Sequence, residues 1–73
     1  MIKKKFKIND QDIEFRELTV GEMRKAKKIL IDDEFEAGLY MMKKSANKND
    51  EWLDSVCMSE LNAVGDWLAN PVE

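Results

Sequence analysis

A strand pattern changes to a helix pattern within a few residues near the N-terminus, and this change constrains the fold more than any other feature. Ile13 and Phe15 alternate with charged neighbours, as in a strand with one buried face. Thr19 and Glu22 form a capping-box pattern, in which the hydroxyl and the carboxylate each accept a hydrogen bond from the other residue's backbone N–H. We therefore expect a strand followed directly by a helix that begins at Val20.

A second alternating segment precedes this strand and predicts a β-hairpin over residues 1–18. Within residues 1–8 the apolar side chains share one parity and lysines fill most other positions, which is typical of an edge strand. Turn-forming residues at 9–12 separate the two segments. The buried face of the hairpin should consist of Phe6, Ile8, Ile13 and Phe15. A two-stranded hairpin is marginal in water, so this face must pack on helices.

Residues 19–70 are predicted to form three helices, or four if the last is split. The first should cover Val20–Ile31, with one apolar side made of Val20, Met23, Ala26 and Leu30. The second follows the acidic residues 32–34 and ends at Lys43 and Lys44, which suits the helix dipole. Asp33 and Glu36 form its capping pattern, and its expected inward stripe is Phe35, Leu39 and Met42.

A long apolar stripe predicts the last helical region. Its members are Leu53, Cys57, Leu61, Val64 and Leu68. Asn49 or Asp50 can cap the start, and Pro71 ends the region. Ser59 can cap a separate final helix, which would split the region near Met58. Both the single helix and the split remain open.

The composition leaves no residues suited to catalysis or to a cofactor. The chain of 73 residues suffices for one α+β domain, 1–73, and contains no histidine. The acidic cluster formed by Asp32, Asp33, Glu34 and Glu36 is placed for helix capping, so we expect neither a catalytic nor a metal site there. Cys57 is the single cysteine and is expected to be a buried free thiol. We therefore predict a protein that is not an enzyme.

Charge is unevenly distributed along the chain. Residues 1–28 hold nine basic against five acidic side chains, and residues 29–73 hold three against ten. Lys3, Lys4, Lys5 and Lys7 fit a solvated strand edge better than a phosphate-binding surface, so we expect no nucleic acid partner. No apolar run is long enough for a membrane span, and no signal-peptide pattern is present, which favours a soluble protein in the cytoplasm.

Methionine and aromatic residues mark the expected partner-binding surface. Methionine packs adaptably, and tyrosine and tryptophan are enriched at the centres of interfaces. If the second helix buries its Phe35 stripe, Tyr40 and Met41 are turned away from it and stay exposed. The predicted partner-binding residues are Tyr40, Met41, Met42, Trp52 and Trp67.

Two segments resemble a known family. The run from Ile13 to Ala26, with its RELTVGEMR core, resembles the start of small tail assembly chaperones of long-tailed bacteriophages. The segment MSELNAVGDWL, from Met58 to Leu68, is similar to the closing helix of that family. Together the segments cover about a third of the chain.

The resemblance implies a non-enzymatic chaperone that coats the long, helical tape measure protein until tail tube subunits polymerise around it. The chain would be the short form, without the frameshifted extension, and self-association is also expected. Two other functions remain open. A DNA-associated regulator would use residues 3–7 together with Lys25, Lys27 and Lys28, and an inhibitor of a host protein would present residues 32–36 to a basic site.

Overall fold

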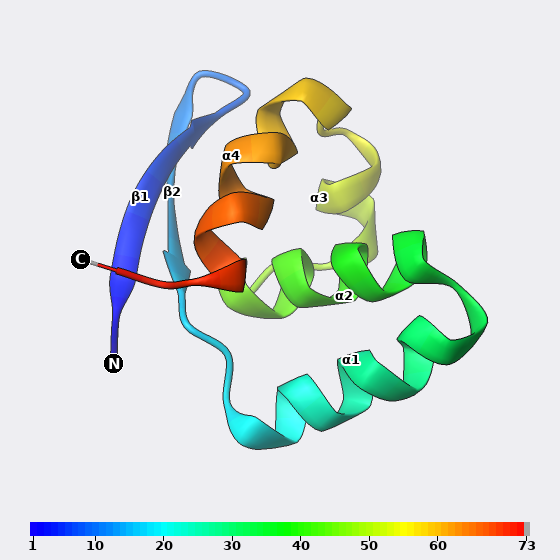
Figure 1. The fold of residues 1–73 in the computed structure, drawn as a ribbon. Helices are drawn as coiled ribbons and strands as arrows, with labels where there is room; N and C mark the ends of the chain where they lie inside the picture. The colour runs from blue at the N-terminus through cyan, green and yellow to red at the C-terminus, as the bar shows by residue number, and fades with distance from the viewer. Residues whose placement is uncertain (73) are drawn as a thin grey trace.

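The computed structural model describes residues 1–72, and Glu73 lies outside the described residues. Within that range the chain forms two strands and four helices: β1 (Lys3–Ile8), β2 (Gln11–Arg16), α1 (Val20–Asp32), α2 (Glu34–Ala46), α3 (Asp50–Asp54) and α4 (Met58–Ala69). Figure 1 shows the hairpin along one side of the molecule, with α4 beside it and α2 between α4 and α1. The predicted α+β class is confirmed, in its four-helix version.

A turn of two residues joins the strands. Asn9 and Asp10 have φ angles of 52° and 62°, and Gln11 already pairs with Ile8 as the first residue of β2. A two-residue hairpin turn needs positive φ at both positions, which Asn and Asp accept better than most residues. The predicted turn over 9–12 is therefore too long, because Gln11 and Asp12 continue the ladder.

The buried face of the hairpin is the predicted one. Ile8, Ile13 and Phe15 are buried, and Phe6 is half-buried. The Phe6 ring meets the rings of Phe15 and Trp67 edge to face, with centroid distances of 5.6 and 6.1 Å. The core is completed from α2 and α4 by Ala46, Val64, Trp67 and Leu68.

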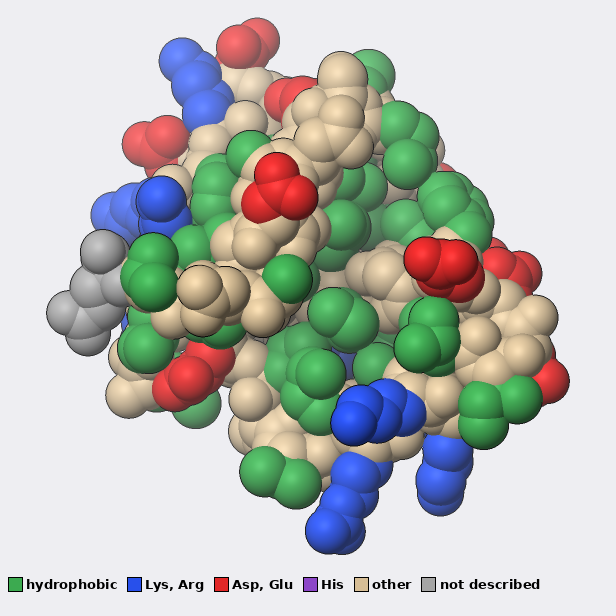
Figure 2. Space-filling model, viewed as in Figure 1, with side chains coloured by type: hydrophobic (Ala, Val, Ile, Leu, Met, Phe, Trp, Pro, Cys, Tyr) green, Lys and Arg blue, Asp and Glu red, His purple; other side chains and the backbone are tan. Residues whose placement is uncertain are grey.

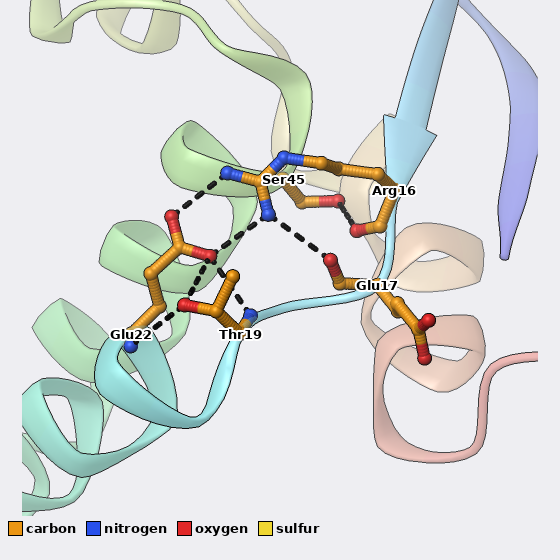
Figure 3. A network of polar contacts seen from close by, with 5 residues as sticks. All are labelled: Arg16, Glu17, Thr19, Glu22 and Ser45. Carbon is orange, nitrogen blue, oxygen red and sulfur yellow. Dashed lines mark hydrogen bonds and ion pairs between the residues drawn. The ribbon is translucent and has the colours of Figure 1, made fainter. Parts of the chain in front are cut away.

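Polar contacts hold the junction between β2 and α1 (Figure 3). The predicted capping box is present: the Glu22 N–H donates to Thr19 Oγ1 at 3.2 Å, and the Thr19 N–H donates to Glu22 Oε1 at 2.9 Å. Two guanidinium nitrogens of Arg16 donate to the Glu22 carboxylate, each at 2.8 Å. Ser45 Oγ on α2 donates to the Arg16 carbonyl at 2.5 Å. These contacts connect α1 and α2 to the same end of β2, and α1 begins at Val20 as predicted.

Among the described helices and strands, α1 packs on α2 alone. Only Ala26 of its predicted apolar side is buried, whereas Val20 and Leu30 are exposed. A single neighbouring helix therefore covers only part of the predicted apolar side. The cap of α2 is as expected, since the Glu36 N–H donates to Asp33 Oδ1 at 3.2 Å.

The last helical region is split, which settles the alternative left open by the sequence. Asn49 caps α3 by accepting from the Trp52 N–H at 2.9 Å, and α3 ends at Asp54. The N-cap of α4 is Cys57, not Ser59, and it makes no side-chain capping bond. Cys57 is exposed, so the expectation of a buried thiol is wrong. The reason is that the helix break removes Cys57 from the stripe formed by its helical neighbours.

Candidate functional site

The structure places the five predicted partner-binding residues on different parts of the molecule. Trp67 is buried in the core at 6% exposure, and its indole N–H donates to the Val72 carbonyl at 2.8 Å. Trp52 is half-buried and packs against the core. Tyr40 is not among the residues that pack on the core, and the ammonium groups of Lys25 and Lys44 lie 5.7 and 5.8 Å from the centre of its ring.

Met41 and Met42 are half-buried and line two hollows on either side of α2. Both also pack against the core, so each contributes part of its side chain to the surface. Trp67 is held inside because its ring packs against Phe6 of the hairpin and its indole N–H is bonded to the segment that follows α4. Whether any of the five binds a partner stays a prediction.

Large apolar side chains are exposed elsewhere, on a face formed by α1, α2 and the start of α4. Leu30, Phe35 and Met58 are each at least half exposed and line hollows of this face. Phe35 was expected to point inward with Leu39 and Met42. This expectation is wrong because Phe35 lies in the first turn of α2, away from the hairpin end of that helix, where the core lies.

Three adjoining hollows cross this face, and we call them together the apolar band. The first is lined by Leu18, Val20, Met23, Arg24 and Lys27. The second is lined by Met23, Ala26, Lys27, Leu30, Glu34, Ala37, Gly38 and Met41. The third is lined by Asp33, Glu34, Phe35, Gly38, Leu39, Met42, Met58 and Leu61. Each hollow shares two lining residues with the next, so the band is continuous from α1 across α2 to α4.

The band is open to solvent and apolar along its length. Figure 2 shows hydrophobic side chains gathered toward α1 and in the hollow between α2 and α4. The second and third hollows have volumes of about 330 and 520 Å³. Continuous exposed apolar surface of this kind marks interaction sites on small proteins. The arrangement is suited to binding another polypeptide by burial of apolar side chains.

Gly38 lies where the second and third hollows meet. A Cβ atom built at this position would meet nothing within 4 Å. The backbone does not require glycine there, since its φ is not positive. The middle of α2 therefore presents bare backbone at the centre of the band, which allows a close approach of another chain.

The α1 end of the band is basic, and acidic side chains line the band at the start of α2. The first hollow contains Arg24 and Lys27, and the third contains Asp33 and Glu34. Figure 2 shows Lys and Arg side chains along the edge where α1 lies, and Asp and Glu side chains where α1 passes into α2. The band thus combines apolar surface with a basic end on α1 and acidic side chains at the start of α2.

The contact between Arg16 and Glu22 fixes α1, and with it the basic end of the band. Hydrogen bonds from Arg16 lower the pKa of the Glu22 carboxyl from 4.5 to about 2, against the opposing effect of burial. The same hydrogen bonds raise the pKa of Arg16. The pair is therefore fully ionised near neutral pH, and its two-pronged geometry orients the first turn of α1.

The lysines of β1 lie opposite acidic residues of β2. Lys5 pairs with Glu14 and Lys7 with Asp12 in the strand register, and Lys3 Nζ lies 3.8 Å from a Glu14 carboxylate oxygen. Neighbouring carboxylates reduce the positive potential of this edge. The positions favour a solvated strand edge over a phosphate-binding surface.

Within residues 1–72 no group of three or more Cys, Asp or Glu side chains is arranged to hold a metal ion. Along the same residues, no helix has the length and apolar character that crossing a membrane requires. No protein-family model, curated protein or solved structure matches this chain.

Sequence reasoning did not include Met58 among the partner-binding residues, and it placed Phe35 on the buried side of its helix. The spacing of apolar residues in α1 predicts that one side of this helix packs against another surface. The spacing alone does not show whether that surface belongs to the same chain or to a bound protein. The helix break before Met58 was needed to bring the first turn of α4 to the band.

Proposed function

We propose that the protein is a non-catalytic chaperone that binds helical segments of a client polypeptide on the apolar band. The observation that carries this proposal is the continuous exposure of Leu30, Phe35 and Met58 across three helices. An amphipathic client helix buries its apolar side in such a groove, as in other helix-in-groove complexes. Methionines on both sides of Gly38 let the surface adapt to varied segments.

The client we propose is the tape measure protein of a long-tailed bacteriophage, with the chain acting as the short form of a tail assembly chaperone. The resemblance supports this client, because its first segment forms β2, the capping box and the start of α1, and its second segment forms most of α4. Both segments therefore build or position the band. Tail tube protein is the proposed second partner, and assembly would take place in the host cytoplasm.

Co-expression with the tape measure protein of a long-tailed bacteriophage tests the proposal. The wild-type chain should increase the soluble fraction of the tape measure protein and co-purify with it. Phe35→Glu combined with Met58→Glu should abolish both effects, since two charges would have to be buried against the client. Both side chains are exposed, so the double variant should fold normally.

Val72→Glu is the matched control, because Val72 is as exposed as Phe35 but lies outside the band. This variant should keep the wild-type effect on the client. An unchanged soluble fraction with the wild-type chain, or full activity of the double variant, would contradict the proposed function.

A further inference from the structure

We propose that the outer edge of β2 binds an extended peptide segment as an added antiparallel strand. The partner it fits is a short stretch of polypeptide in which basic residues alternate with an apolar one. The hollow beside this edge shares no lining residue with the apolar band. The proposal therefore concerns a second binding surface and does not depend on the proposed function.

The hydrogen-bond pattern of the hairpin turns main-chain groups of β2 outward at every second residue. The Glu17 N–H donates to the Ile2 carbonyl at 2.9 Å, and from this pair the antiparallel register continues without a break to the turn. In such a ladder, bonded residue pairs alternate with unbonded ones. Asp12 and Glu14 belong to unbonded pairs, so their N–H and C=O groups point to the outer edge of β2.

In the part of the chain that the structure describes, these groups of Asp12 and Glu14 have no partner. Arg16, the next residue of the same orientation, has its carbonyl bonded by Ser45 Oγ (Figure 3). No comparable contact within residues 1–72 reaches the main chain of Asp12 or Glu14. Their groups are spaced about 7 Å apart along the strand. An extended chain presents its own N–H and C=O groups at this spacing, whereas a helix uses them internally, so the geometry selects an extended segment.

A hollow of about 410 Å³ beside the edge provides room for the added segment. One wall is the edge of β2, and the other is the end of α2 with Asn47 and Lys48. Ile13 and Ala46 contribute apolar side chains to it, each 7% exposed. The middle residue of the segment, between the two bonded ones, directs its side chain to the same face as Ile13. A β-branched apolar residue fits that position.

Charge determines which residues suit the two bonded positions of the segment. The side chains of Asp12 and Glu14 are exposed on the outer face of the hairpin. Within residues 1–72 Asp12 makes no ion pair, and Glu14 has only a contact of 3.8 Å with Lys3. Opposite charges on neighbouring strands attract, so lysine or arginine suits both positions. On the outer edge of β1 the corresponding residues Lys3, Lys5 and Lys7 repel the same segment.

Titration with a synthetic peptide, followed by NMR on the isotopically labelled chain, tests this surface. The probe is the pentapeptide Thr-Lys-Val-Lys-Thr with acetylated and amidated ends, whose lysines lie opposite Asp12 and Glu14 in the antiparallel register. Amide shifts should concentrate at these two residues. They should saturate with a dissociation constant of about 1 mM, as expected for a few main-chain hydrogen bonds.

N-methylation of the peptide separates main-chain pairing from charge attraction. Methyl groups on both lysine backbone nitrogens remove the N–H groups that face β2 and should abolish binding. A methyl group on the valine nitrogen points away from β2, so this matched peptide should bind within about twofold of the parent peptide.

Proline variants test the same edge from the side of the protein. Glu14→Pro replaces an outward N–H by a ring that blocks an added strand, leaves the ladder to β1 intact, and should abolish binding. Lys5→Pro makes the same change on the outer edge of β1 and should leave binding unchanged. Glu14→Gln removes the charge alone and should weaken binding about threefold or less. Circular dichroism melts establish that each variant is folded, and the N-methylated peptides decide the question if Glu14→Pro unfolds.

An absence of shifts at about 5 mM peptide would overturn the proposal, since a site of the expected affinity is mostly occupied there. Binding of the doubly methylated peptide, or loss of binding on methylation of valine, would also overturn it. Shifts at Asp12 and Glu14 that depend on protein concentration without peptide would show that a second copy occupies the edge, which contradicts the proposal as well.

Discussion

Glu22 is bonded to two elements at once. Its carboxylate accepts the backbone N–H of Thr19, which caps α1, and it binds the guanidinium of Arg16 at the end of β2. The side chains of Glu22 and Arg16 are 18% and 26% exposed, so the pair is partly shielded from solvent. A contact of this geometry contributes more than an exposed ion pair.

Acid should weaken the fold through Glu22. Its pKa is about 2 in the folded chain and 4.5 as an ordinary carboxyl, so the pair contributes stability above pH 4.5 and loses it as the pH falls toward 2. Glu22→Gln should lower the free energy of unfolding at pH 7 by about 1–2 kcal/mol, less than the full linkage value because the pair is partly solvated. Urea titrations between pH 2 and pH 7 measure this change.

Glu14→Gln is the control, since the contact of Glu14 with Lys3 is long and half exposed. This variant should stay within about 0.5 kcal/mol of the wild type. The Glu22 variant should also show a flatter loss of stability below pH 4.5. Equal pH profiles for the wild type and Glu22→Gln would show that the Arg16 contact is not a source of stability.

Single residues whose role depends on near neighbours could be predicted from the sequence. The cap formed by Thr19 and Glu22 is such a case, because all its atoms come from one turn of chain. The contact of Glu22 with Arg16 could not be predicted from the sequence, although both residues lie in the same motif, because it depends on the bend between β2 and α1. The expectation that Cys57 is buried was wrong for a similar reason, because its exposure follows from the break between α3 and α4.

At the scale of elements, α1 differs from α2 and α4, the two helices that reach the hairpin. Helices α2 and α4 pack on the hairpin, whereas α1 packs only on α2. Its start and orientation are fixed by the β2 junction, and its outer apolar side chains remain uncovered. The existence and bounds of α1 were predictable from its cap and spacing. The exposure of its apolar side was not predictable, because helical periodicity does not show how many neighbouring elements will cover a helix.

Gly38→Ala tests whether the centre of α2 is bare in the single chain. Because a Cβ there meets nothing, alanine should raise the free energy of unfolding by about 0.5–1 kcal/mol. Thermal melts at protein concentrations too low for self-association measure the gain. Gly65→Ala is the comparison: its Cβ would lie 3.4 Å from Met42 Cε, so its gain should be smaller. A loss of stability in Gly38→Ala would mean that the band is closed in the monomer.

For the whole molecule, the hairpin and the C-terminal half of α4 form the core, and the opposite face is left apolar and open. A sequence of this length predicts that the core is thin and that a partner would stabilise it. It does not predict where the open face lies, because that depends on how α1, α2 and α4 meet. The client proposed above would bind on this open face.

The most direct test of the account maps client contacts by NMR on the isotopically labelled chain. We would add a helical segment of the tape measure protein and follow amide and methyl signals. The account predicts shifts concentrated at Leu30, Phe35, Gly38 and Met58, with Lys5 on the outer face of the hairpin unchanged. Shifts confined to the lysines of β1 or to the surface around Tyr40, or no shifts at all, would contradict it.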